Sequence, residues 1–269
     1  HEQTGRELRI ARPVELSVFP SLGVVLREVE LGGSTAADEA PPTRAAELHV
    51  RVGVASLLSG NPALESLTLR GLVVPLGRDA KGEQRWTLSG DGTLVLEAQA
   101  APVRQGQLDL AVRATGESLP PEGIALSLRA VVRHDLASRE LALAPFEIAG
   151  AGLRLTGEVR GDLGERPAFA GRVAVAETSP RAVLASLGRP DVRTSDPAVL
   201  GRLEANLPFR ADAGVLAIDD LRLTLDDTTV TGRLAVNHST GALAFDLAAD
   251  RLDLDRYLPR PAPSAPAAA

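Results

Sequence analysis

Aliphatic residues alternate with polar or small residues in stretch after stretch of this chain. Leu108, Leu110, Val112 and Ala114, for example, have Asp109 and Arg113 between them, and similar runs recur from about residue 7 to residue 258. A period of two places successive side chains on opposite faces of a β-sheet. The short connections with turn composition are typical of antiparallel hairpins. We therefore expect a mainly β protein, a long twisted antiparallel sheet curled into a groove or a sandwich-like shape, with one or two short helices.

The composition is that of a globular protein and argues against several functions. Of the 269 residues, 44% are hydrophobic and 24% are charged, which is typical of a folded chain. The formal net charge is -6 and no basic patch stands out, so nucleic acid is not an expected partner. The absence of cysteine excludes disulfides, thiolate metal sites and a cysteine nucleophile. No apolar run reaches the roughly 20 residues of a membrane-spanning helix.

One segment has clear helical signals. Ser179-Pro180 provides an N-cap and a proline at the first helical position, and Gly188 ends the segment. The same cap-plus-proline signal at Asp196-Pro197 predicts a second, shorter helix that ends near Gly201.

The sequence SGDGT at residues 89–93 separates two blocks of predicted strands. We expect an N-terminal β block at residues 1–89 and a second β block at 90–258 that continues the sheet. Residues 259–269 have the composition of a disordered Pro/Ala linker. The glycines of the GDG stretch at 90–92 and the pair Gln105-Gly106 are interpreted as turns, not as a phosphate-binding loop.

Several short motifs occur in an order that resembles the AsmA family. TGRELRI, FPSLGVVLREVELG and a strand running into LLSG come first, and SPRAVLASLG, TSDPAVL, LTLDDTTVTGRLAV and DRYLP follow in the second half. Each motif is short, and their collinear order over residues 3–259 makes the match specific. The inner-membrane helix and the further β-rich region that the family usually has are missing here, as in an excised periplasmic piece.

The resemblance implies a location and a function. AsmA-like proteins are anchored in the inner membrane of Gram-negative bacteria, project into the periplasm and are similar to bridge-like lipid transfer proteins. Their sheets curl into an open groove with an apolar lining. The implied function is to shelter or conduct phospholipid acyl chains in support of outer-membrane biogenesis. The implied partners are phospholipids, the inner membrane and the outer membrane, and no cofactor or catalytic residue is implied.

The polar residues that invite a chemical interpretation have simpler structural ones. His49 alternates with aliphatic neighbours on a strand, and His134 falls at a predicted hairpin turn. Asp226-Asp227 and Asp250 sit at strand corners, where aspartate caps turns, although an acid/base pair or a calcium site is the competing interpretation. We expect no enzyme activity and no metal. Trp86 and Tyr257 are structural anchors or, alternatively, residues at the level of lipid headgroups.

The aliphatic stripe is the candidate site. It could be an ordinary core between two sheets or the lining of a lipid groove, and both use the same residues. The predicted lining consists of Leu108, Leu110, Val112, Ile124, Leu126, Leu128, Leu153, Leu155, Val173, Val175, Leu221, Leu223, Leu225, Leu243, Phe245 and Leu247.

Two other classes of function compete with lipid handling. Exposed sheet edges could recruit another chain by strand addition, as in a scaffold for outer-membrane protein assembly. A hydrolase on a β-scaffold is the third possibility, and it would need clustered carboxylates or histidines.

Overall fold

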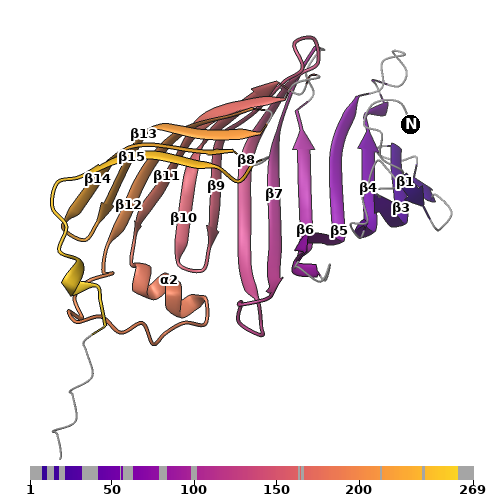
Figure 1. Cartoon of the computed structure of the whole chain (residues 1–269). Coiled ribbons are helices and arrows are strands. Elements are labelled where there is room, and N and C mark those ends of the chain that lie inside the picture. Colours follow the sequence, from indigo (N-terminus) through magenta and orange to yellow (C-terminus); the bar gives the residue numbers. More distant parts are fainter. Residues whose placement is uncertain are drawn as a thin grey trace, which may run out of the picture.

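The chain forms one continuous antiparallel sheet in the computed structural model (Figure 1). The structure describes residues 8–10, 15–17, 22–31, 42–54, 56, 63–78, 84–97, 102–162, 164, 167–212, 214–237 and 240–259. The protein is mainly β, as the alternation of the sequence predicts. From β3 onward each described strand pairs with the next one along the chain, so the sheet is a long meander.

Fifteen strands make up this sheet. They are β1 Leu8–Ile10, β2 Glu15–Ser17, β3 Leu22–Leu31, β4 Thr43–Val52, β5 Leu64–Arg78, β6 Gln84–Leu96, β7 Val103–Gly116, β8 Ile124–Asp135, β9 Glu140–Gly150, β10 Leu153–Asp162, β11 Ala168–Thr178, β12 Leu203–Asp212, β13 Val215–Leu225, β14 Thr228–Asn237 and β15 Leu243–Ala249. Both β1 and β2 pair with β3.

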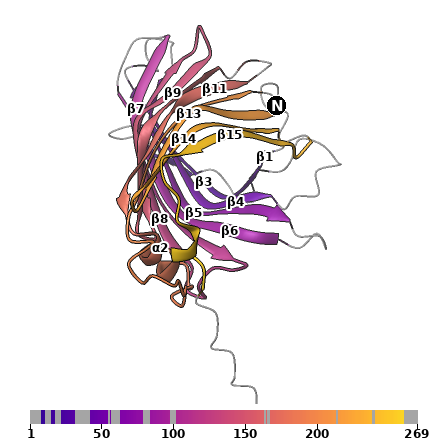
Figure 2. The same ribbon diagram turned by 60° about the vertical axis from the view of Figure 1, so that its left-hand side comes forward.

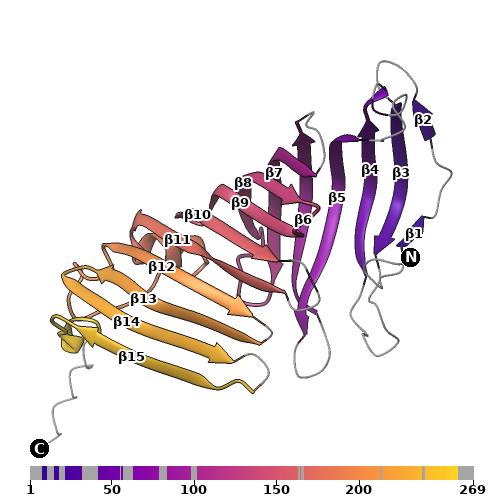
Figure 3. The ribbon, with the colours of Figure 1, turned by 90° about the horizontal axis from the view of Figure 1, so that it is seen from above.

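The sheet twists strongly and does not close. Seen from above, the strands β3 to β6 run across the direction of β11 to β15 (Figure 3). Figure 2 shows the curvature of the sheet from the side. The terminal strands β1 and β15 do not pair with each other. Within the described residues there is one sheet, and no second sheet packs on it as a sandwich core requires.

The helix at residue 180 is confirmed, and the second predicted helix is wrong. α2 spans Pro180–Ser186, with the Ser179 side chain accepting a hydrogen bond from the Ala182 backbone N–H. Gly188 follows with φ +77°, the left-handed conformation that glycine favours after a helix. Residues 196–201 instead form turns. Their backbone N–H groups make hydrogen bonds outside the segment: that of Asp196 donates to the Arg256 carbonyl, and that of Leu200 donates to the Asp226 carboxylate.

Two predicted turns are also wrong. Gly90 and Gly92 lie inside β6, and Gln105-Gly106 lies inside β7. The sequence predicts these glycines to be turn residues, yet they lie inside strands. At Gly90 and Gly106, the absence of a side chain allows the backbone of the neighbouring strand to come close. The division between residues 89 and 90 stays a prediction, although the sheet runs through it without interruption.

Extra residues interrupt the register at a few places. In β13, the pairs on either side of Asp219-Asp220 shift by one residue relative to β14, because Ile218 pairs with Leu234 and Leu221 with Gly232. Residues 215–225 therefore form one bulged strand, although their aliphatic alternation breaks at Asp219-Asp220. The bulge returns the aliphatic residues on both sides of it to the same face of the sheet.

Candidate functional site: the apolar face of the sheet

All sixteen aliphatic and aromatic residues predicted as a lining lie on one face, which we call the apolar face. Residues directly opposite each other in neighbouring strands share a face. One row of directly paired residues follows this face across the sheet from β7 to β15. It consists of Leu110, Leu128, Ile148, Leu155, Val175, Ala205, Leu223, Val230 and Ala249. Sequence reasoning therefore selected residues that the fold brings together, although their contact with lipid stays a prediction.

The apolar face also includes residues that the sequence analysis missed. In β9, Phe146 lies directly opposite Gly157 of β10, and Ile148 lies directly opposite Leu155. In β12 and β13, Phe209 faces Ile218. The period-two pattern of Leu207-Pro208-Phe209 would have revealed the β12 residues, whereas the bulges in β9 and β13 hide the alternation.

Burial of the apolar face decreases toward the end of the sheet. Ile124, Ala130 and Phe146 are 9%, 7% and 7% exposed. Apart from Ile124, the predicted lining residues of β7 to β13 are half-buried. On β15, Leu243, Phe245 and Leu247 are 59%, 65% and 47% exposed. Because no described layer covers this face, it presents a large apolar surface of the kind that marks interaction sites.

Charged side chains gather on the opposite face, which we call the polar face. Ion pairs cross neighbouring strands there, as between Arg233 and Asp246 at 2.8 Å and between Arg210 and Asp219 at 3.1 Å. These exposed pairs contribute little to stability individually. Because the acidic residues lie on the polar face, the apolar face from β8 to β15 carries no acidic residue outside the bulges of the described strands.

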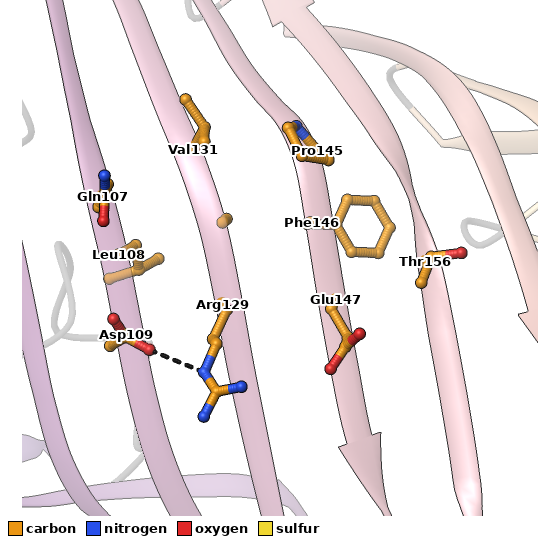
Figure 4. A pocket seen from close by; sticks show the side chains of 10 residues that line it. Gln107, Leu108, Asp109, Arg129, Val131, Pro145, Phe146, Glu147 and Thr156 are labelled. Atoms are coloured by element: carbon orange, nitrogen blue, oxygen red, sulfur yellow. Dashed lines mark hydrogen bonds and ion pairs between the residues drawn. The ribbon is translucent and has the colours of Figure 1, made fainter.

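The shallow pockets on the surface of the sheet are lined mainly by side chains of the polar face. The one drawn in Figure 4 spans β7 to β10 and includes Gln107, Glu147 and the Asp109–Arg129 ion pair. The carboxylates and the guanidinium alternate across the strands, so their charges compensate each other. We see no arrangement in this hollow for binding a particular ligand. The apolar face, in contrast, is an open surface.

Glycines inside the strands repeatedly fall on the apolar face. They are Gly90, Gly92, Gly106, Gly150, Gly157, Gly161, Gly171 and Gly232. At Gly157 and Gly171, an added Cβ would lie 2.0 and 2.1 Å from carbonyl oxygens of the neighbouring strand. Only a residue without a side chain allows this approach of the backbones, and sheets use such positions to curve.

One end of the sheet carries the segment that we call the end cap. It consists of α2, residues 189–202 and residues 250–259, which include the 3-10 turn η1 at Leu254–Arg256. Val199 in this segment is 0% exposed. Arg181 of α2 holds the segment together, because its guanidinium donates to the Val192 and Val199 carbonyls and to the Thr194 hydroxyl.

Asp226 ties the end cap to the β13–β14 turn. Its carboxylate accepts the backbone N–H groups of Leu200, Gly201 and Arg202 at 2.8, 2.9 and 3.0 Å. It also accepts the Tyr257 hydroxyl at 2.9 Å. Partial burial opposes ionisation of Asp226, but these hydrogen bonds together lower its pKa below the usual value. The structure thus favours a turn-capping role for Asp226 over acid/base chemistry.

Arg256 makes a second link in the same region. Its guanidinium reaches Asp196 at 2.9 Å and Asp227 at 3.4 Å. The hydrogen bond from the Ala198 backbone, followed by the one from Arg256, lowers the pKa of Asp196. The motifs LDD and DRY, far apart in the sequence, therefore meet in one hydrogen-bonded cluster.

The remaining candidate residues have structural partners. His49 lies on β4, 2.9 Å from the Glu47 carboxylate. His134 is inside β8 and not in a turn, which corrects the prediction, and the following Asp135 caps the turn by accepting the Ala137 N–H. Trp86 donates its indole N–H to the Glu117 carbonyl at 3.1 Å. His238, which the sequence also places at a predicted hairpin turn, lies outside the described residues.

Over the described ranges, no group of three or more His, Asp or Glu side chains could hold a metal ion. No helix among those same residues has the length and apolarity to cross a bilayer.

Comparison with known proteins finds no match to a family model, to a curated protein or to a solved structure. The AsmA resemblance and the functions that it implies are therefore proposals.

Proposed function

We propose that this protein is a non-enzymatic lipid-binding protein whose apolar face shelters acyl chains. The observation that carries the proposal is the continuous apolar face from β7 to β15, which is uncovered among the described residues. Keeping so many Leu, Val, Ile and Phe side chains in contact with water is unfavourable by about 25 cal/mol per Å². An acyl chain lying on this face would recover that free energy without demanding hydrogen-bond partners.

The resemblance to the AsmA family supports the same proposal and adds a setting. In that setting the chain is a periplasmic segment of an inner-membrane-anchored protein, and it conducts phospholipid acyl chains for outer-membrane biogenesis. The mechanism is passive, since acyl chains slide along the apolar face while their headgroups stay in water.

Lipid binding can be tested with a pair of variants on adjacent residues. Leu126 lies on the apolar face, and Ser127 lies on the polar face of the same strand. Purified protein is incubated with phospholipid, and bound lipid is counted by native mass spectrometry. We expect Leu126→Arg to lose bound lipid, because an arginine on the apolar face cannot be desolvated cheaply.

Ser127→Arg is the matched control and keeps the wild-type amount of lipid. Circular dichroism verifies that both variants fold. The proposal fails if folded wild-type protein binds no lipid, or if the two variants retain lipid equally.

A second candidate function rests on the last strand. Every residue of β15 is exposed, and β14 is its one described partner. An unpaired edge of this kind can accept a strand of another protein. The protein would then be a scaffold for assembly of outer-membrane proteins. In-cell crosslinking from β15 separates the two functions, since protein adducts on β15 support the scaffold and lipid adducts on Leu126 support lipid binding.

A further inference from the structure

The hydrogen bonds at the two ends of β15 show which of its backbone groups lie at the edge of the sheet. Just before the strand, the Ala242 carbonyl accepts the N–H of Asn237 in β14. Just after it, the Asp250 N–H donates to the Thr229 carbonyl, and the described register between β14 and β15 has no bulge. In an antiparallel ladder, residues that bond to the partner strand alternate with residues that point away from it. Because the even-numbered Ala242 and Asp250 bond to β14, the odd-numbered residues of β15 direct their N–H and C=O groups to the open edge.

The same odd-numbered positions carry the large apolar side chains of β15. They are Leu243, Phe245 and Leu247, which lie on the apolar face and are 59%, 65% and 47% exposed. Asp246 is the one charged residue of the strand, and it pairs with Arg233 at 2.8 Å on the polar face. The strand has no lysine or proline, and no bulge among its described pairs with β14, although such features commonly keep strand edges from pairing. This edge is therefore suited to pairing with another strand.

Two other segments of the chain match this edge less well. At the opposite end of the sheet, β1 and β2 have three residues each, so either strand would pair with less than half of the seven residues of β15. Residues 260–269 include Pro261, Pro263 and Pro266, which have no N–H to donate to a ladder. A strand of matching length and pattern is β15 of a second copy.

β15 is complementary to itself in an antiparallel pair centred on Phe245. In that register, the Phe245 residues of the two copies lie opposite each other, and Leu243 of each copy lies opposite Leu247 of the other. All of these residues direct their backbone groups outward, so their N–H and C=O groups bond across the pair. The large side chains then lie on one common face, where aromatic and aliphatic cross-strand pairs stabilise a sheet.

Neighbouring registers are less favourable. A shift by one residue sets outward-directed groups opposite inward-directed ones, and the apolar face of one copy then continues into the polar face of the other. A shift by two residues in one direction places the two Asp246 carboxylates opposite each other, and like charges there are destabilising. The same shift in the other direction sets Leu247 opposite Gly241, which offers no side chain to pack against. In the register centred on Phe245, each Asp246 lies opposite Ala244 instead.

We propose that two copies of this chain associate through their β15 edges, antiparallel and centred on Phe245. This inference goes beyond lipid binding and does not depend on it. The pair has a twofold axis at Phe245, so it closes as a dimer and joins the two apolar faces into one continuous surface. Two seven-residue edges make a smaller interface than the roughly 1,200 Å² of stable complexes. We therefore expect a dissociation constant of about 10–100 µM, with monomers in dilute solution.

Sedimentation equilibrium of the full chain measures this association. We expect the wild type to change from monomer to dimer as its concentration rises from about 1 to about 500 µM. Phe245→Lys places two like charges opposite each other and should weaken the dimer about tenfold or more. Val95→Lys is the matched control, because Val95 is 52% exposed but lies on the interior strand β6, and it should leave the dissociation constant unchanged. Circular dichroism verifies that the variants are folded.

A second pair of variants tests the register. Ala244→Lys puts a lysine opposite Asp246 of the second copy, twice per dimer, and should tighten the dimer about threefold at low salt. Ala248→Lys adds the same charge to the same face of β15, also two residues from its own Asp246. It lies opposite Ala242 of the second copy, however, and should leave the dissociation constant unchanged.

Each possible result supports or overturns the inference. Monomers throughout the concentration range, or oligomers that grow beyond the dimer, overturn it. An unchanged dissociation constant in Phe245→Lys overturns the pairing of the edges, and equal effects of Ala244→Lys and Ala248→Lys overturn the register. Photocrosslinking from position 245 in cells separates the occupants of the edge. Adducts with a second copy support the dimer, whereas adducts with a different protein alone overturn it and favour the scaffold.

Discussion

The end cap and the apolar face stabilise the fold in different ways. In the end cap, Val199 is completely buried and Asp226 accepts four hydrogen bonds. On the apolar face, Leu223 is half-buried and Phe245 is 65% exposed. Among the described residues, a large side chain is completely buried only in the end cap, whereas burial along the apolar face is partial and falls to its lowest on β15. Along the face, the hydrogen-bonded ladder holds the sheet together and leaves apolar side chains partly exposed.

Removing the Asp226 carboxylate should have the largest effect. Asp226→Ala leaves three backbone N–H groups and the Tyr257 hydroxyl without their acceptor. We expect a loss of about 2–4 kcal/mol in the free energy of unfolding. Asp226→Asn keeps one acceptor oxygen and suits the left-handed backbone at φ +52°, so it should cost less. Urea unfolding measures both, and equal losses would contradict the role of the hydrogen bonds.

A pair of truncations compares the packing of the two regions directly. Val199→Ala removes methyl groups from a fully buried site and should cost about 2 kcal/mol. Leu223→Ala removes more atoms, yet from a half-buried site, and should cost about 1 kcal/mol. Chemical denaturation of the two variants decides the order. A larger loss for Leu223→Ala would mean that the apolar face is covered in solution.

Acid should loosen the end cap before the rest of the sheet. The folded state lowers the pKa of Asp196 and Asp226, so their stabilising contribution is present above about pH 4 and is lost as the pH falls through the depressed values. Tyr257 is the one tyrosine and Trp86 the one tryptophan of the chain. Tyrosine absorbance should therefore change at higher pH than tryptophan fluorescence. Coincident transitions would argue against a separate response of the end cap.

The smallest effect on stability is expected at the end of the sheet. Phe245→Ser changes a side chain that is 65% exposed on an edge strand, and it should alter the unfolding free energy by about 0.5 kcal/mol or less. Thermal melting of the variant measures the change. A loss near that of Val199→Ala would show that another chain or segment buries Phe245.

Local sequence patterns predicted most of the sheet and the composition of its apolar face. The alternation around Leu110 and Leu155 is strict, and the registers place both on the same face. Ser179-Pro180 was equally informative, since capping is a local property. The signal at Asp196-Pro197 gave a wrong helix prediction. The backbone N–H groups of Asp196 and Leu200 donate to the Arg256 carbonyl and the Asp226 carboxylate, which are distant in the sequence.

Glycines were the other source of error. Gly90 and Gly106 are predicted from the sequence to be turn residues, whereas both are strand residues on the apolar face. A glycine needed for the close approach of two strands has the same local signature as a glycine in a turn. Likewise, no local pattern showed that Arg104 and His134 would face each other, because that depends on the pairing of β7 with β8.

Site-specific photocrosslinking to lipid is the most direct test of whether the apolar face binds acyl chains. A photoreactive amino acid is placed at Leu128 on the apolar face or at Ser127 on the polar face of β8, and the protein is irradiated with phospholipid. We expect lipid adducts at Leu128 and none at Ser127. Equal labelling at the two positions, or no adduct at Leu128 in folded protein, would contradict this expectation.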